Sequence, residues 1–429
     1  MPQNIFKILT PMFLTLSLSA TSLSELVESG LKNNSIIQKN NLQIQLMEAK
    51  KAESKAKHFG ELDVVGSYTH YNLPRTLAPI VPSALAPGTT VDTTQDLFST
   101  GLQYSVPLFT GGALEQQVGI DNIATQMSQS KKKLSREELI YNIRSLYLSA
   151  LSLQELQSSQ EGYVLALEDL KEKIRYGVEL GKRAKIELLK ADNDLTQAKG
   201  NVLKTKSSLR MLKETLSALT HHENIDHFEA FVVEPTRTND TYDENNLKHL
   251  ERFRLQELEV EKGGRLIKKV AASSKPQVGL NAYAGYNYDL DQRDPFEEEK
   301  LWQVAVNVKW NIFDFGATSS RVQQAKITQL QALSQSDATT EGFRKLFAKA
   351  KNDIETALAN YETTQSQYAL LQESQTIEQA RYDVGVATLN DLLLAKSKTE
   401  LAQSQMIQSK YAYQNGVFYL DYLLERGER

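Results

Sequence analysis

Residues 302–313 read Trp-Gln-Val-Ala-Val-Asn-Val-Lys-Trp-Asn-Ile-Phe, a stretch in which apolar and polar side chains alternate. Its even positions carry tryptophan, valine and isoleucine, while its odd positions up to 311 carry glutamine, alanine, asparagine and lysine. Successive side chains of a strand point to opposite faces, so this pattern predicts a strand with one apolar and one polar face.

The apolar face of this strand has no obvious cover. The sequence predicts only three further strands, near 64–71, 102–108 and 278–288, which are too few to build a second sheet against it. Trp302 and Trp310 stand at the two ends of the apolar row, about 26 Å apart along the strand, as the aromatic girdles of a transmembrane barrel do. We therefore expect these strands to face lipid. Four strands cannot enclose a lumen and an open edge cannot face lipid, so the barrel must be shared among several copies of the chain.

Most of the remaining sequence is free to form very long helices. None of the ten prolines falls between 108 and 234 or after 295, and proline is the residue that breaks helix interiors. Apolar and small residues recur at alternating steps of three and four from Leu139 to Leu153 and from Ile354 to Leu371, which predicts packing against a partner helix. A helix from about 114 to 180 would run roughly 100 Å.

The chain is an internal repeat. A shift of 204 residues aligns Phe109 with Phe313 and Gly181 with Gly385 without a gap. The strands upstream align at a shift of 215, and the difference of eleven residues falls in the proline-rich stretch 73–96. Loops absorb insertions at little cost, so each half is predicted to be a β-hairpin followed by a long helical hairpin.

Composition excludes several classes of function. The formal net charge of −4 gives no basic footprint for nucleic acid, and the absence of cysteine excludes disulfides, thiol nucleophiles and a lipidated N-terminal cysteine. Residues 1–20 resemble a signal peptide, with Lys7 before a short apolar run. No segment has 18 consecutive apolar residues. Because the six histidines show neither metal-ligand spacing nor a nucleophile–base pattern, we expect no cofactor, no metal and no enzymatic activity.

Three motifs carry a resemblance to a known family. Residues 105–113, Ser-Val-Pro-Leu-Phe-Thr-Gly-Gly-Ala, and 309–317, Lys-Trp-Asn-Ile-Phe-Asp-Phe-Gly-Ala, each lead a strand into a helix. Residues 381–395, Arg-Tyr-Asp-Val-Gly-Val-Ala-Thr-Leu-Asn-Asp-Leu-Leu-Leu-Ala, resemble the periplasmic hairpin turn of the TolC family of outer-membrane efflux proteins. Residues 178–191 are a looser first-half equivalent, and the resemblance covers nearly the whole mature chain.

The resemblance implies a mainly α fold with a β-barrel contribution, in which a homotrimer shares a 12-stranded transmembrane barrel and a periplasmic α-helical tunnel. It implies a passive exit duct of a tripartite efflux or type I secretion system, in the bacterial outer membrane, with a periplasmic adaptor and an inner-membrane transporter as partners. The expected division is a signal peptide 1–20, a first repeat 21–220 (β-hairpin 60–110, helical hairpin 113–220), an equatorial connector 221–246 with a small strand at 228–233, a second repeat 247–424 (β-hairpin 276–313, helical hairpin 317–424) and a tail 425–429.

The resemblance also assigns roles to individual residues. It implies adaptor-docking tips at six positions: Val178, Leu180, Gly181, Val384, Gly385 and Val386. It implies a periplasmic aperture at Glu187, Tyr382 and Asp391, with the first two linked and the third in an acidic ring. The sequence departs from the family pattern at Ala387, where an arginine is expected, and at Leu394, where a second acidic ring is expected. We therefore expect the closed state to be held more weakly or by other residues.

Two alternative functions remain open. A periplasmic coiled-coil adaptor would combine a helical hairpin with compact β-domains and would not be duplicated. A cytosolic coiled-coil scaffold protein would need neither a signal peptide nor lipid-facing strands.

Overall fold

The computed structural model describes residues 20–223, 225–233, 249–290 and 298–427, so the expected signal peptide lies almost wholly outside the described residues. The chain forms two compact units. One contains α1 (Leu23–Asn33), α4 (Lys185–Thr220), α7 (Leu389–Leu423) and the C-terminal parts of α3 (Ala113–Glu179) and α6 (Ala317–Asp383). The other contains most of α2 (Ser35–Ala56), α5 (Glu251–Ala271), the N-terminal parts of α3 and α6, and the sheet; η1 (Lys57–Phe59), η2 (Pro82–Leu85) and η4 (Ala272–Ser274) are short 3-10 helices.

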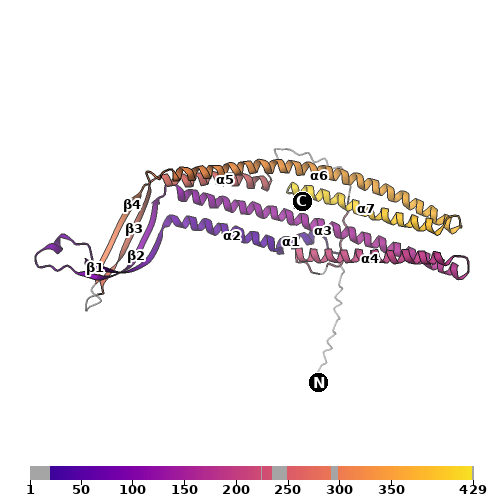
Figure 1. Cartoon of the computed structure of the whole chain (residues 1–429), viewed down its shortest axis with the longest axis horizontal. Coiled ribbons are helices and arrows are strands. Elements are labelled where there is room, and N and C mark those ends of the chain that lie inside the picture. The colour runs from indigo at the N-terminus through magenta and orange to yellow at the C-terminus, as the bar shows by residue number, and fades with distance from the viewer. Residues whose placement is uncertain (1–19, 224, 234–248, 291–297, 428–429) are drawn as a thin grey trace, which may run out of the picture. The chain divides into compact units, whose positions relative to one another are not determined.

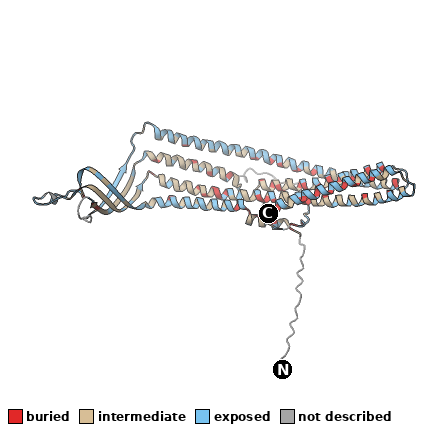
Figure 2. Ribbon diagram, turned by 60° about the horizontal axis from the view of Figure 1, so that its bottom comes forward, coloured by how far each residue is buried: buried red, intermediate tan, exposed pale blue. Residues whose placement is uncertain are grey.

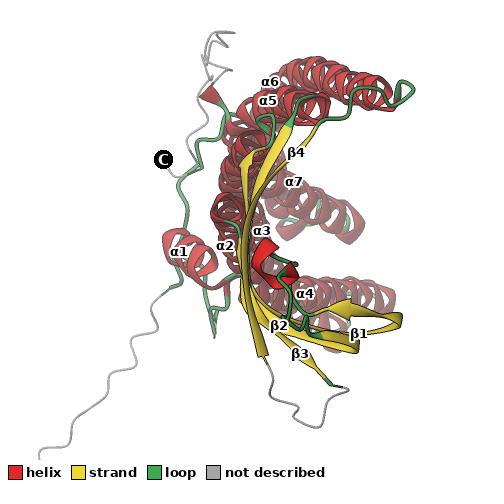
Figure 3. Ribbon diagram, turned by 90° about the vertical axis from the view of Figure 1, so that its left-hand side faces the viewer, coloured by secondary structure: helices red, strands yellow, loops and turns green. Residues whose placement is uncertain are grey.

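The two predicted β-hairpins join into one antiparallel sheet of order β1-β2-β3-β4. The strands are β1 (Glu61–Thr76), β2 (Thr93–Phe109), β3 (Gln277–Asp289) and β4 (Glu298–Lys309), and together they form a curved sheet (Figure 3). Pairing between β2 and β3 connects the halves, for example Leu102 with Ala284. β1 and β4 each pair on one side within the described chain, so both outer strands present a free edge.

The last strand differs from its expected position. β4 begins at Glu298 and ends at Lys309, four residues before the predicted limits at each end. Lys309 pairs with Gln277, the first residue of β3, so the chain beyond it has no partner strand. Trp310 instead donates its indole N–H to the carbonyl of Ser274 (3.1 Å). Side-chain alternation continues past Lys309, but pairing, which defines the strand, does not.

The long helices form as the proline-free stretches predict. α3 and α6 have 67 residues each and return through α4 and α7 (Figure 1). The predicted stripe faces the interior, since Leu139, Ile143 and Ala150 are all buried in the main core of their unit. Figure 2 shows the buried residues gathered along these hairpins, whereas most of the sheet is exposed or intermediate. No described helix has both the length and the apolar character of a bilayer span.

The connector does not form the expected small strand. Within the described part of 221–233, only one parallel bridge occurs, between Thr21 and Phe228. Tyr147 of α3 fixes this segment by donating its hydroxyl hydrogen to the carbonyl of Glu229 (2.8 Å) and packing edge-on against Phe228. The backbone of this segment pairs with Thr21 alone among the described residues, which is too little pairing for a strand.

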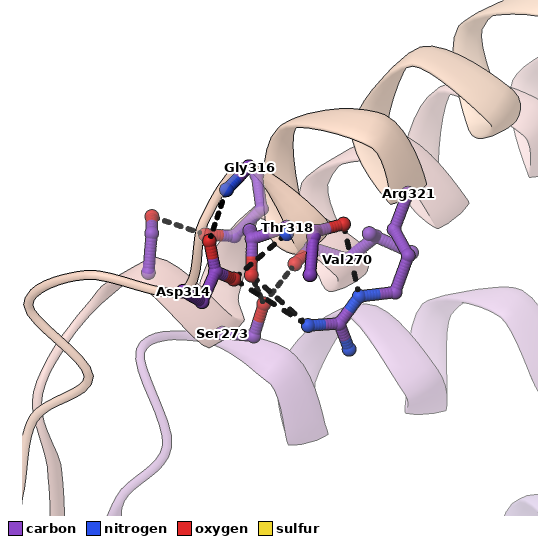
Figure 4. Close-up of polar contacts among 9 residues, drawn as sticks. Val270, Ser273, Asp314, Gly316, Thr318 and Arg321 are labelled. Carbon is purple, nitrogen blue, oxygen red and sulfur yellow. Dashed lines mark hydrogen bonds and ion pairs between the residues drawn. The ribbon is translucent and has the colours of Figure 1, made fainter.

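The junction from β4 to α6 is held by a capping carboxylate (Figure 4). Asp314 accepts hydrogen bonds from the N–H groups of Thr318 (2.7 Å) and Gly316 (3.2 Å). The hydrogen bonds from the Thr318 side chain and N–H lower the pKa of Asp314, and Arg321 lies 3.8 Å from the carboxylate. Capping satisfies the free N–H groups of the first turn, so the strand passes into the helix without a flexible linker.

Candidate functional site

The turns of the two helical hairpins pack around a common apolar core. It is formed by buried residues of four helices: Leu167, Leu170 and Ile174 of α3, Ala191, Leu195 and Ala198 of α4, Tyr382 of α6, and Leu389, Leu392 and Leu393 of α7. The sequence places apolar residues at helical spacing on both arms of each hairpin, and their burial fixes the position of one turn against the other.

The first turn joins α3 to α4 at Gly181. This glycine has a φ of +68°, which L side chains rarely adopt, and its N–H donates to the carbonyl of Val178 (3.0 Å). Of the three residues expected at this tip, Leu180 and Gly181 are exposed, whereas Val178 is half-buried against the apolar core.

The second turn joins α6 to α7 at Gly385, which has a φ of +79°. Val384 and Val386 flank it and are 74% and 68% exposed. Two large apolar side chains therefore stand in solvent on either side of this turn.

The aperture residues meet through an arginine that was not among the expected residues. Tyr382 is 5% exposed, and burial raises its pKa. The guanidinium of Arg183, in the first turn, lies 4.3 Å from the centre of the Tyr382 ring and 3.3 Å from the Glu187 carboxylate. The expected direct link between Tyr382 and Glu187 is absent among the described contacts. Arg183 stands between them, so the contact across the hairpins is a cation–π stack.

The position of the Arg183 side chain depends on a glycine in α3. A Cβ atom added at Gly177 would lie 2.6 Å from Cγ of Arg183, so any larger residue there would displace the arginine. Gly177, Arg183, Glu187 and Tyr382 therefore act as one unit, with the glycine giving space, the glutamate orienting the guanidinium and the tyrosine receiving it.

The internal repeat contains the signal that would have found Arg183. The shift of 204 residues aligns Arg183 with Ala387, the position where the family resemblance expects an arginine. The chain thus carries its arginine at the equivalent position of the other hairpin. The exchange between halves is visible only when the two hairpin turns are aligned with each other.

Asp391 lies apart from the Arg183 contacts. It is exposed and forms a capping box with Thr388 at the start of α7, accepting from the Thr388 hydroxyl (2.7 Å) and N–H (3.0 Å). These hydrogen bonds lower the pKa of Asp391. The carboxylate therefore stays ionised at pH values below the usual titration range of an aspartate.

A second residue that the sequence reasoning missed is Lys396, which is 8% exposed in α7. Burial is the largest cause that lowers the pKa of its amine, followed by the charge of Lys173, while Asp169 and Asp383 act in the opposite direction. Burying a charge costs free energy unless it is paired. Lys396 therefore works against the close packing of the hairpins that the Arg183 stack favours.

In the other unit, one face of the sheet is apolar and uncovered. Trp302 is 76% exposed and Trp310 is 58% exposed, and Val304, Val306 and Val308 between them are at least 59% exposed. The register extends this face over all four strands, since Val64, Leu102, Ala284 and Trp302 lie in one row. A soluble protein does not leave such a face in water.

Aromatic residues border this apolar face at both ends. Tyr286 lies one row beyond Trp302, and Tyr68, Phe98 and Tyr288 share the row after that; the other end carries Phe59, Phe109 and Trp310. Trp310 lies ten residue steps along β4 and its extension from Lys300, the partner of Tyr286. Ten residues span about 33 Å along a strand, or about 25 Å at a tilt of about 40°, which is the height of the apolar band of an outer-membrane barrel.

An uncovered apolar sheet with aromatic borders, joined to long helical hairpins with exposed apolar turns, is the architecture of an outer-membrane channel protein. A sequence model of the family described as "Outer membrane efflux protein" matches residues 26–221 and 247–424. A comparison with curated protein sequences gives no match.

Solved structures show the same fold. The CmeC outer membrane channel of Campylobacter jejuni matches with a TM-score of 0.80 at 18% identity, over 94% of this chain and 86% of that one. CusC matches with a TM-score of 0.81 at 17% identity, over 94% and 91% of the two chains. The MtrE outer membrane channel of Neisseria gonorrhoeae, solved in an open state, matches with a TM-score of 0.78 at 16% identity, over 94% and 89%.

The chain belongs to the outer membrane efflux protein family. It is an efflux channel of the bacterial outer membrane with a tunnel in the periplasm, as the resemblance to the TolC family implied. Its family and its structural neighbours are channels and not enzymes.

Proposed function

We propose that the channel is a homotrimer in which three four-stranded sheets close into one 12-stranded barrel. The observation that carries this proposal is the sheet with an uncovered apolar face and two free edges, β1 and β4. Unpaired N–H and C=O groups cannot face hydrocarbon, so each edge needs a strand from another copy. Three copies give an even number of antiparallel strands, as bacterial barrels have.

In this proposal, repeats 21–220 and 247–424 each supply one hairpin to the barrel and one to the tunnel. The exposed turns around Leu180 and Gly181, and around Val384, Gly385 and Val386, dock a periplasmic adaptor, which connects the channel to an inner-membrane transporter. The channel acts as a passive exit duct, in tripartite efflux or in type I secretion, for cargo that the transporter selects.

The aperture at the turns is closed by the Arg183–Tyr382 stack that Glu187 orients. Three copies of Asp391 form an acidic ring that favours cations. The contact joins the two hairpins of one chain, so a movement of one hairpin against the other breaks it. Support comes from the gonococcal relative, which was solved in an open state.

The test replaces Val386 in the second turn with glutamate. Desolvating a new charge in an apolar contact is unfavourable, so Val386→Glu should abolish export. The side chain is 68% exposed, so the same variant should still run as a heat-dissociable trimer from the outer membrane. Val386→Thr, which keeps the shape without charge, is the control and should export. Normal export by the glutamate variant would refute the docking role, and a monomer in unheated gels of the wild type would refute the trimer.

A further inference from the structure

The two hairpin turns have the same backbone. In each, the glycine N–H donates to the carbonyl three residues earlier at 3.0 Å, and the next two N–H groups share one carbonyl at 2.8 and 3.1 Å. Gly181 and Gly385 both have positive φ, and an added Cβ would meet nothing within 4 Å at either position. A partner that recognised backbone shape alone could not distinguish the turns.

The side chains on this common backbone differ in charge. Lys182 occupies the position of Val386, and Lys185 that of Leu389. Residues 177–190 contain four cationic and two acidic residues, whereas residues 381–394 contain one cationic and two acidic residues. The first turn is therefore net positive and the second turn is net negative with an apolar tip.

The two lysines are free to bind a partner. Both are exposed, and neither side-chain ammonium group forms a hydrogen bond or ion pair with the described residues. Arg183 between them already contacts Glu187 and Tyr382, so it is not available in the same way. Solvated ammonium groups beside the exposed Leu180 combine charge with a small apolar contact.

We propose that the first turn, residues 180–185, docks the part of the adaptor's hairpin tip that carries a carboxylate, while the second turn docks an apolar part. This inference rests on the proposed function, in which both turns meet the adaptor. Charge complementarity argues for the carboxylate, because opposite charges across an interface select the partner and fix its position. The first turn thus sets the specificity and the second supplies apolar contact.

The experiment uses the full-length channel in nanodiscs. A photo-crosslinker at Val384 in living cells first identifies the adaptor, which is then purified. Its Kd is measured against the wild type, against Lys182→Gln/Lys185→Gln, and against Lys204→Gln/Lys398→Gln, which removes two exposed lysines of α4 and α7 away from the turns. The turn variant should bind on the order of tenfold more weakly at low salt, since each exposed ion pair contributes up to about fivefold. At about 0.5 M salt, the turn variant and the wild type should converge.

The outcomes separate the two levels of the proposal. If no adaptor is captured at Val384 and none binds the wild type, the proposed docking function fails. If the adaptor binds and the turn variant matches the control at both salt concentrations, the carboxylate inference is overturned. Lysine-dependent sedimentation with peptidoglycan sacculi, with unchanged adaptor affinity, would assign the first turn to the cell wall and also overturn it. The charge-reversed variant Lys182→Glu/Lys185→Glu should bind the adaptor weakly. Recovery of its binding when a lysine replaces the adaptor carboxylate would support the inference.

Discussion

Removing the Arg183 guanidinium should open the proposed aperture. The ion pair between Arg183 and Glu187 lies within one hairpin, so it persists when the hairpins separate. Only the stack on Tyr382 crosses between hairpins, and it is lost on opening. With an arginine side chain that is 33% exposed, such a stack contributes about 1 kcal/mol. Three copies would favour the closed state by about 3 kcal/mol, a factor on the order of 10² in the closed-to-open ratio.

The assay is single-channel conductance of the purified trimer in planar bilayers. Arg183→Ala should raise the open probability by up to this factor. Arg183→Lys should raise it partly, because an ammonium group keeps the charge without the planar stacking surface. Arg175→Ala is the control, since Arg175 pairs with Glu172 on its own helix. Equal open probability for Arg183→Ala, Arg175→Ala and the wild type would refute the reasoning.

The remaining predictions concern the membrane belt, the turn and the ring. Val306→Arg should destabilise the barrel by about 2–4 kcal/mol at the centre of the apolar band and remove trimers from the outer membrane. Asn307→Arg on the opposite face of the sheet should be tolerated. Equal trimer yields for the two variants would contradict the proposal that the Val306 face meets lipid. Gly385→Ala should lower the free energy of unfolding by about 1–2 kcal/mol because this glycine has a positive φ. Gly200→Ala inside α4 should raise the free energy of unfolding by about 0.5–1 kcal/mol. Midpoints of thermal unfolding that shift in the same direction for both variants would contradict this. Because the pKa of Asp391 is lowered, the preference of the pore for cations should persist at pH values below the usual titration range of a carboxylate and disappear as the pH falls through the lowered pKa. Reversal potentials should show no such preference in Asp391→Asn at any pH. A variant with the wild-type preference would exclude the ring.

The repeating local patterns could be predicted from the sequence because each depends on near neighbours along the chain. Alternation in 302–310 specified a two-faced strand, and the lack of proline specified the long helices, both of which the structure contains. Gly181 and Gly385 marked the turns, since only glycine accepts that backbone conformation without strain. Trp302 marked one edge of the apolar face, although the register places further aromatic residues beyond it.

Contacts between distant segments were decided only by the tertiary structure. Pairing of β2 with β3 merged two hairpins into one sheet, and the start of β3 at Gln277 ended β4 at Lys309, because a strand extends only as far as its partner. Arg183 meets Tyr382 across 199 residues, and no local pattern encodes the direction of a long side chain over a neighbouring helix. Lys396 carries a charge of the kind usually found at the surface, yet it is buried in α7, where charges of α3 and α6 act on its pKa. Local periodicity fixes which face of an element is apolar, whereas the identity of the neighbour on that face depends on how the whole chain packs.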